Sequence, residues 1–353
     1  MLSEQQGTTG RVTEVSRSRI AVQGQSVTLP ALIVGGKTII VQGNWFKVAA
    51  VKDEDYQENT IVSSLDEFVT DFRPQLEGRA DIFTFSQKPA DPVPRFPFPY
   101  EWDSIAAIPI ISFSDWWTNR VSGDLRKDVR RAAKRGVVVR SVPFTDAFVR
   151  QIMDIYDETP IRQGRPFWHY HKGFDVVHLE NATYLEQSDF LGAFCGDELI
   201  GFVKVVFAGQ LACLMQIISK DAHRDKRPMN ALIARTVELC ATKCCKHLTY
   251  GKYRYYGIDS SLTAFKHRNG FQEILVPKYY VPLTTKGRVA VRMGLHRGAR
   301  ALVPSASPGP WSTSSRNRTS PICASSPCAR WRRTSSRDGR ASSSTRSSGS
   351  SVD

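Results

Sequence analysis

Residues 211–271 constrain the fold more than any other stretch, because short apolar runs alternate there with helical segments. In chain order they comprise an apolar run at 211–219, a basic turn at 220–228, an amphipathic segment at 229–243, an apolar run at 247–251 and a helical segment at 260–271. This order of strand, helix, strand and helix is a βαβα unit. Since such crossovers join parallel strands, we predict that the two strands are parallel neighbours in one sheet.

The turn before the segment at 229–243 has the properties of a phosphate site. A helix that begins just after a strand presents free backbone N–H groups and the positive end of its dipole, and both favour an anion. Arg224, Lys226 and Arg227 lie in this turn. We predict that these side chains, with the N–H groups of Met229 and Asn230, hold phosphate groups. The alternative is a basic turn that contacts only solvent.

The rest of the chain also mixes strands and helices. Strands are predicted at 29–34, 38–41, 45–51, 80–85, 105–112, 137–142, 190–195, 199–207 and 274–283, and helices at 64–76, 114–120, 124–136, 145–159 and 286–302. Five prolines between residues 89 and 99 predict an extended crossover whose aromatic side chains pack down, with a docking segment as the alternative. We predict an α/β (α+β) fold, in which helices flank a mixed, twisted sheet.

Net charge has to be divided along the chain before it is interpreted. The chain has a net charge of +14, and residues 299–353 supply +7 of it, from nine arginines and two aspartates. Seventeen of these 55 residues are serine, and periodic apolar positions are missing, which predicts disorder. We interpret this tail as the product of a shifted reading frame and exclude it from fold reasoning; an RNA-binding tail is the alternative. Mass spectrometry of the expressed protein distinguishes the two.

Several classes of protein are disfavoured by what the sequence lacks. No apolar run approaches the ~20 residues of a membrane helix, and the N-terminus has no signal-peptide pattern. We therefore expect a cytoplasmic protein without membrane insertion. The seven cysteines have no partner His or Cys at zinc-site spacing, so no metal is expected. A P-loop and a Ser/His/Asp nucleophile elbow are missing as well.

A loop at 160–173 is rich in arginine, histidine and aromatic residues. Arg162 and Arg165 are predicted to clamp a carboxylate or phosphate of an acceptor, because guanidinium groups bind such anions in bidentate fashion. Salt bridges to Asp157 or Glu158 are the alternative. Gln163 and Tyr170 of the same loop are assigned to acceptor binding with them.

Three side chains in this region are candidates for a general base. Glu158 ends the predicted helix at 145–159, and His169 and His171 lie in the loop that follows. An unperturbed histidine, with a pKa of about 6.5, is suited to removing a proton near neutral pH. The alternative for each is a surface or hydrogen-bonded loop residue.

The order of elements in residues 124–283 resembles the acyl-CoA N-acyltransferase (GNAT) superfamily. In that family the loop after the fourth strand holds the pyrophosphate of coenzyme A through the motif Gln/Arg-x-x-Gly-x-Gly/Ala. Arg224 occupies the first position here, and Arg227 and Met229 replace the two small residues. The resemblance implies that the splayed backbone of Gln216, Ile217 and Ile218 polarises an acyl carbonyl.

A sub-branch, the Fem-like proteins, is more closely similar. The sequence at 226–233, Tyr250-Gly-Lys, Phe265-Lys266, Gly270-Phe271, the basic helix at 125–137 and the loop at 159–164 carry this resemblance. It implies that Tyr253 or Tyr255 returns a proton to the leaving group, with core or rim packing as the alternative. Lys266 is predicted to reach the cofactor, and a side chain that faces solvent is its alternative. The resemblance also implies tandem halves, with a degenerate GNAT-like half at 1–120, an acyltransferase domain at 121–298 and the tail at 299–353.

The activity implied by these resemblances is N-acyl transfer. The donor is acetyl-CoA or another acyl-CoA, no metal takes part, and the acceptor is a small-molecule or peptide amine. Because some Fem-like proteins use aminoacyl-tRNA, a tRNA-dependent peptidyltransferase is the alternative enzyme. The mild positive charge outside the tail and the helix at 124–136 are compatible with tRNA. A third alternative is an inactive GNAT-like module that only binds a ligand.

Overall fold

The computed structural model describes residues 16–22, 25–162, 164–255 and 257–297. The strands before residue 120 are β1 (Ser16–Val22), β2 (Gln25–Val34), β3 (Lys37–Gln42), β4 (Val48–Val51), β5 (Ile82–Ser86) and β6 (Tyr100–Pro109). The main strands after it are β7 (Val137–Val142), β10 (Ser188–Cys195), β11 (Glu198–Ala208), β12 (Leu211–Ser219), β13 (His247–Lys252) and β14 (Gln272–Pro282). Together they form one mixed twelve-stranded sheet in the order β1-β2-β3-β4-β5-β14-β6-β13-β12-β11-β10-β7.

Helices and short turns connect these strands. The helical elements are η1 (Glu54–Tyr56), α1 (Leu65–Glu67), η2 (Phe68–Phe72), α2 (Arg73–Leu76), α3 (Phe113–Asp115), η3 (Trp116–Arg120), α4 (Gly123–Lys134), α5 (Asp146–Tyr156), α6 (Phe174–Asn181), η4 (Leu185–Gln187), η5 (Asp221–Lys226), α7 (Pro228–Thr242), α8 (Ser261–Arg268), α9 (Thr285–Arg292) and η6 (Leu295–Arg297). A small ribbon of β8 (Ile161–Arg162) and β9 (Arg165–Pro166) lies apart from the main sheet. None of the helices in the described ranges is both long and apolar enough to cross a bilayer.

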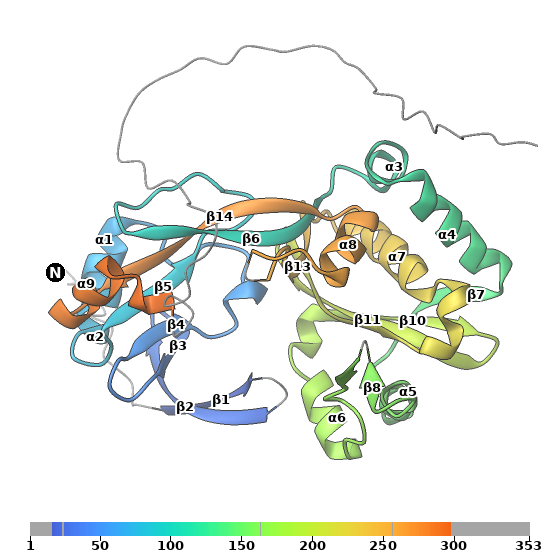
Figure 1. The fold of residues 1–353 in the computed structure, drawn as a ribbon, viewed down its shortest axis with the longest axis horizontal. Coiled ribbons are helices and arrows are strands. Elements are labelled where there is room, and N and C mark those ends of the chain that lie inside the picture. The colour runs from blue at the N-terminus through green and yellow to red at the C-terminus, as the bar shows by residue number, and fades with distance from the viewer. Residues whose placement is uncertain (1–15, 23–24, 163, 256, 298–353) are drawn as a thin grey trace, which may run out of the picture. The chain divides into compact units, whose positions relative to one another are not determined.

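The same strand pattern occurs twice in the sheet. β2, β3 and β4 are antiparallel and β5 is parallel to β4, while β10, β11 and β12 are antiparallel and β13 is parallel to β12. The strand after each parallel pair lies beside the other pair: β6 pairs with β13, and β14 pairs with β5. β6 and β14 also pair with each other, as Figure 1 shows. Residues before and after 120 are therefore joined through exchanged strands.

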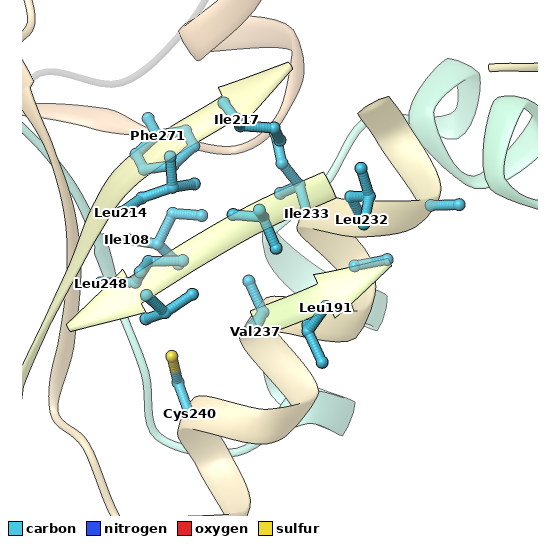
Figure 2. Packing of buried hydrophobic residues seen from close by; sticks show 14 of the residues in the cluster. Ile108, Leu191, Leu214, Ile217, Leu232, Ile233, Val237, Cys240, Leu248 and Phe271 are labelled. Carbon is cyan, nitrogen blue, oxygen red and sulfur yellow. The ribbon is translucent and has the colours of Figure 1, made fainter. Parts of the chain in front are cut away.

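The core around α7 explains why the predicted βαβα unit folds as it does. Leu232, Ile233 and Val237 of α7 are fully buried, and they pack against Leu214 of β12 and Leu248 of β13 (Figure 2). These apolar positions recur at helical spacing, so one face of α7 is buried on the sheet. The parallel pairing predicted for the two strands is confirmed.

The opposite side of β11 and β12 is covered by α5 and α6. Phe148, Ile152 and Tyr156 of α5 form a second core with Phe202 of β11 and Val177 of α6. The Thr145 hydroxyl caps α5 by accepting a hydrogen bond from the Phe148 N–H. α6 was not predicted, because its first residue follows Gly173, which offers no side-chain cap.

Two predicted helices differ from the structure in extent. The segment at 64–76 begins as predicted, with Ser64 as N-cap, but is divided into α1, the π-helical turn η2 and α2. Pro74 has no N–H to bond the carbonyl four residues earlier, which accounts for the irregular turn before it. The helix predicted at 286–302 ends at Arg292, and Gly294 adopts φ 72°. Its last five residues, 298–302, lie outside the described ranges.

The proline-rich segment packs down, as predicted. Phe96 is buried, and its ring contacts those of Phe85 and Tyr279. The Tyr279 hydroxyl accepts a hydrogen bond from the Arg95 N–H at 2.9 Å. The following strand, β6, begins at Tyr100, whereas the sequence predicted a strand from residue 105.

Candidate functional site

β12 and β13 diverge after a short parallel contact. Their pairing extends over three positions, from Leu211 opposite His247 to Cys213 opposite Thr249. β13 then continues beside β6, up to Lys252 opposite Ile105. The two strands therefore open toward their C-terminal ends, which is where α7 and α8 begin.

A bulge in β12 lies along this opening. Lys204 of β11 is opposite Gln216, but Val205 is opposite Leu214, so Met215 is an extra residue in the strand. A bulge disturbs the alternation of side chains and local pairing. As a result, Ile217 joins the core under α7, while Gln216 and Ile218 contact the α5 side. The predicted residues Gln216, Ile217 and Ile218 thus lie on the diverging strand.

Arg227 begins α7 in a conformation that usually requires glycine. Its φ is 59° and its ψ is 40°, in the left-handed region. No side-chain cap for the helix is found in the described part of the chain, and the first helical bond runs from the Ala231 N–H to the Arg227 carbonyl. The N–H groups of Met229 and Asn230 therefore belong to the uncapped first turn. The backbone thus forms a turn typical of glycine, although the residue is arginine.

The side chains of this turn are linked to α4. The Arg227 Nε lies 3.3 Å from the Asp128 carboxylate, and Arg135 forms an ion pair with Asp225. Lys226 Nζ lies 2.8 Å from His223 Nδ1. Arg224 is exposed. The predicted basic turn is thus held against α4, with part of its charge neutralised by Asp128.

α8 contributes a buried lysine beside the same opening. Lys266 is fully buried, and its ammonium donates to the Lys252 carbonyl at the end of β13. The ammonium lies 4.6 Å from the centre of the Tyr250 ring and 5.2 Å from that of Tyr255. Burial lowers the pKa of Lys266 to about 8. A cation with aromatic neighbours and no carboxylate partner among the described residues is suited to an anionic ligand.

Asn230 connects α7 to α8. Its side-chain amide donates to the Asn269 oxygen at 3.0 Å, and the Asn269 amide donates to the Phe265 carbonyl at 2.8 Å. Asn269 is buried. This connection fixes the start of α7 relative to the helix that carries Lys266.

The two predicted tyrosines differ in accessibility. Tyr253 is 7% exposed and belongs to the core around α7, and burial raises the pKa of its phenol. Tyr255 is 45% exposed and its ring faces the Lys266 ammonium. Of the two, only Tyr255 combines contact with Lys266 and access to solvent.

A polar cluster lies on the α5 side of β12. The Gln216 amide nitrogen is 2.6 Å from the Tyr156 hydroxyl and 3.3 Å from His169 Nε2. The His169 ring stacks on the Tyr156 ring with 4.3 Å between their centres. The amide can donate to Nε2 only if the ring carries its proton on Nδ1, so the network indicates that tautomer.

Glu180 and Lys172 complete this cluster. The Glu180 Oε2 lies 3.9 Å from His169 Nδ1, too far for a hydrogen bond, and neither atom has a partner among the described residues. The other Glu180 oxygen accepts from Lys172 at 2.6 Å. Burial, together with the positive charges of Lys172 and Arg162, lowers the pKa of His169 to about 3. The imidazole is therefore neutral near pH 7.

Glu158 and Arg162 hold the ends of three elements together. The Glu158 carboxylate accepts hydrogen bonds from the N–H groups of Asp221 at 2.7 Å and Ala222 at 2.8 Å. It also pairs with Arg162 at 3.1 Å, and Arg162 donates to the carbonyl oxygens of Ser219 and Ile155. The salt bridge named as the alternative for Arg162 is thus formed, and these contacts position the start of η5.

The remaining predicted acceptor residues lie around this loop. Arg165 is exposed in β9, and Tyr170 is 39% exposed. His171 has φ 60°, and its N–H donates to the Asp157 carboxylate at 2.7 Å. Gln163 lies outside the described residues. The structure therefore brings His169 to the strand opening but leaves Arg165 on the surface.

Sequence reasoning missed Glu180, Lys172 and the hydroxyl of Tyr156. The signal for Tyr156 was its helical spacing with other apolar residues, which indicates burial and not a hydroxyl facing β12. Glu180 lies in helix α6, which was not predicted, so the direction of its side chain could not be inferred from the sequence. The Asp128 partner of Arg227 was also missed, because the two residues are far apart in sequence.

An open pocket of about 820 Å³ lies near the first residues of β12, away from the opening. Tyr56, Tyr184 and Gly209 are among its lining residues, and none of the predicted site residues takes part. The described residues contain no group of three or more His, Cys, Asp or Glu side chains arranged for a metal ion. We therefore take the strand opening, with its polar side chains and the α7 turn, as the candidate site.

No family model matches the sequence, and no curated protein matches it. Among solved structures, L-PGS from Bacillus licheniformis is similar at 11% identity and a TM-score of 0.49, over 75% of this chain and 88% of that one. The C-terminal domain of a protein described as a lysylphosphatidylglycerol synthetase from Agrobacterium fabrum is similar at 14% identity and a TM-score of 0.47, over 75% and 87% of the chains. FemX is similar at 11% identity and a TM-score of 0.46, over 74% and 87%.

Because these TM-scores lie below 0.5, they assign no activity to this chain. The fold class expected from the sequence is confirmed by the topology itself. Helices flank a mixed sheet in which an antiparallel run, the crossover through α7 and a diverging parallel strand follow in GNAT-like order.

Proposed function

We propose that the chain is an acyltransferase that moves an acyl group, acetyl in the simplest case, from an acyl-CoA to an amine. The observation that carries the proposal is the left-handed conformation of Arg227 at the uncapped start of α7, where β12 and β13 diverge. A residue with a side chain is disfavoured in that conformation by roughly 1–2 kcal/mol, and such strain is concentrated at ligand sites. The turn is thus kept in the form that exposes N–H groups to a phosphate.

The α7 side of the opening is assigned to the cofactor. The N–H groups of Met229 and Asn230, with Arg224, Lys226 and Arg227, would hold the pyrophosphate of coenzyme A. The diverging backbone at Gln216, Ile217 and Ile218 would polarise the thioester carbonyl. Lys266, buried and without a carboxylate partner, would contact the same cofactor.

The α5 side of β12 is assigned to the acceptor, a small-molecule or peptide amine. An amine attacks a thioester only when it is neutral, so a group must accept its proton. His169, with its pKa of about 3, is a poor base in the observed geometry. Movement of Glu180 from 3.9 Å into hydrogen-bond distance of Nδ1 would stabilise the imidazolium and raise the pKa of His169. We therefore propose these two residues as the base, assembled when the acceptor binds.

The remaining predicted residues receive supporting roles in this proposal. As the amine nitrogen bonds to the acyl carbon and the C–S bond breaks, the thiolate of coenzyme A needs a proton, and Tyr255 would return one. Arg165, Gln163 and Tyr170 would bind the acceptor. Glu158 and Arg162 would position η5, because their polar groups are occupied by neighbours.

We also propose that residues 1–120 are a degenerate GNAT-like half, followed by the acyltransferase half at 121–298. The repeated pattern, an antiparallel run followed by one parallel strand, supports this division. A cytoplasmic location remains our expectation for an enzyme that uses acyl-CoA.

A second candidate donor, aminoacyl-tRNA, is favoured by α4. Arg130, Arg131 and Lys134 are exposed on this helix, and no salt bridge of theirs is found within the described ranges. α4 is tied to the α7 turn by Arg227 and Asp128. A basic helix next to a phosphate-binding turn is suited to a nucleic-acid backbone.

One experiment distinguishes the donors. The purified full chain is incubated with acetyl-CoA or with charged tRNA, and thermal stability and thioester or ester cleavage are measured with an amine mixture. A ligand at 100 times its Kd stabilises the folded state by about 2.7 kcal/mol. Stabilisation by acetyl-CoA with thioester cleavage supports the proposal, and stabilisation and cleavage only with charged tRNA support the alternative. No response to either indicates an inactive module.

Substitutions at Arg227 test how the phosphate is held. Arg227→Gly keeps the left-handed turn and removes the side chain, whereas Arg227→Glu adds negative charge beside Asp128. If backbone N–H groups dominate, acetyl-CoA affinity survives the first change and is abolished by the second. Asp128→Asn is the matched control, because it releases Arg227 from its ion pair and should tighten binding. Unchanged affinity in Arg227→Glu would remove the phosphate assignment.

A further inference from the structure

A surface of apolar and basic residues lies on α9, on the residues that follow it up to η6, and on the turn before β4, outside the proposed active site. Its apolar members, which we call the α9 patch, are Trp45, Val289, Met293 and Leu295. They are 79%, 50%, 65% and 44% exposed, respectively. Large apolar side chains grouped on a surface mark sites of interaction, whereas single ones need no explanation.

The inner face of α9 is fixed to the sheet. Gly287 and Ala290 are buried, and a Cβ on Gly287 would lie 2.0 Å from the Asp81 carbonyl oxygen, so no larger residue fits there. The Asp81 carboxylate accepts from Thr284 at 2.8 Å and from the Lys47 N–H at 2.9 Å. The orientation of α9 is thus determined by close packing, and the helix lies at one edge of the fold (Figure 1).

Trp45 is displayed by a tight turn next to this helix. Gly43 in that turn has φ 95°, and a Cβ there would lie 2.0 Å from the Phe46 carbonyl oxygen. The Lys286 ammonium donates to the Trp45 carbonyl and lies 4.7 Å from the centre of its ring. Val289 follows Lys286 by one helical turn, and Met293 follows Val289 by another, so the apolar residues are consecutive along one face.

The charges around the patch are positive. Arg288 and Arg292 are exposed on the same outer face, four residues apart. Arg288 donates to the Thr285 hydroxyl, and neither arginine forms a salt bridge with a described carboxylate. Lys286 pairs with Asp81 at 3.3 Å but remains 40% exposed. Apolar side chains with a tryptophan, bordered by arginines, are the pattern of helices that lie in a bilayer interface.

We propose that the α9 patch docks the protein onto an anionic lipid bilayer surface, with Trp45, Val289 and Met293 in the headgroup region. Arg288 and Arg292 complement the negative charge of the lipids. A nucleic acid would be attracted by the arginines, but it would gain little from Val289 and Met293. The bilayer is therefore the partner that uses both kinds of residue.

The test is co-sedimentation of the full chain with vesicles of phosphatidylcholine alone or with 30% phosphatidylglycerol, a composition of about one anionic lipid in three. Binding is expected only to the anionic vesicles. Arg288→Gln and Arg292→Gln should each weaken it about fivefold, since a surface cation contributes about 1 kcal/mol. Val289→Gln with Met293→Gln should weaken it about tenfold through lost apolar burial.

Matched controls separate this surface from general charge and hydrophobicity. Arg130→Gln with Arg131→Gln removes two exposed cations from α4, and Ile111→Gln removes a side chain that is 76% exposed elsewhere. The arginines of residues 299–353 are the same in every variant. Both controls should bind like the parent, and equal losses in the controls and the α9 variants overturn the proposal.

Fluorescence gives a second readout. The chain has seven tryptophans, so the spectrum of Trp45→Phe is subtracted from that of the parent to isolate Trp45. The difference spectrum should move to shorter wavelength with anionic vesicles. The docking proposal is overturned if the α9 variants instead weaken binding to a single-stranded RNA probe. It is also overturned if the parent self-associates and the α9 variants sediment with a lower mass.

Discussion

Replacing Glu158 by glutamine tests whether this residue is a base or an anchor for the basic loop. In the structure its two oxygens accept three hydrogen bonds, from the N–H groups of Asp221 and Ala222 and from Arg162. Glutamine has one acceptor oxygen, and its amide hydrogens must face at least one of these donors. The substitution preserves volume while it removes the charge and at least one hydrogen bond.

The expected loss of stability follows from the contacts. The Glu158 and Arg162 side chains are 17% and 15% exposed, so solvent screens them only in part. A hydrogen bond to a charged group contributes roughly 1.5–3 kcal/mol, and the two bonds that remain are weaker because their acceptor no longer carries a negative charge. We therefore expect Glu158→Gln to lower the free energy of unfolding by about 2–3 kcal/mol and to weaken acetyl-CoA binding, because η5 precedes the α7 turn.

Urea unfolding, followed by acetyl-CoA titration of the folded variant, measures both effects. Glu238→Gln is the matched control, because Glu238 pairs with Arg235 on the surface at 2.6 Å with both side chains more than 40% exposed. The free energy of unfolding of Glu238→Gln should fall by less than about 1 kcal/mol. If Glu158→Gln is as stable as this control, and only the rate and pH profile of acyl transfer change, then Glu158 is the proton acceptor and the anchoring argument is refuted.

Three further substitutions have expected outcomes. Leu232→Ala should lower the free energy of unfolding by about 2–5 kcal/mol in urea, since the side chain is fully buried under α7. The pKa of His169 is about 3 when folded and about 6.5 when unfolded, so the unfolded state binds more protons below pH 6.5. Stability should therefore fall on acidification by up to about 1.4 kcal/mol per pH unit, and His169→Asn should reduce that slope. Lys266 has a folded pKa of about 8, as does Lys204, so stability should rise between about pH 8 and 10.4. Lys266→Met should reduce this rise and abolish the proposed acyl transfer while circular dichroism stays unchanged.

The βαβα unit could be predicted because its determinants are local. The apolar residues of α7 recur at helical spacing, and the strands on either side are short apolar runs. Gly270 ends the following helix with φ 82°, as a C-terminal glycine commonly does. The basic turn was also located correctly, but the conformation of Arg227 was not, since arginine seldom adopts positive φ.

The side proposed for the acceptor could be predicted only in part, because it is assembled from distant segments. Tyr156, His169, Glu180 and Gln216 belong to four different elements or loops. His169 was selected by its residue type, but its burial, which lowers its pKa, depends on packing against Tyr156 and Trp168. Glu158 was predicted as a candidate base and Arg162 as a residue that clamps an anion, whereas their shared contacts with η5 and β12 depend on the tertiary fold.

The exchanged strands β6 and β14 also determine how the chain can be divided. A fragment ending at residue 120 would carry β6 without β13, and the complementary fragment would carry β14 without β5. Each would expose a long unpaired strand edge, which favours aggregation. Produced together, the two fragments should instead recover the sheet from two chains, so the protein is a natural candidate for a split reporter whose signal depends on reassembly.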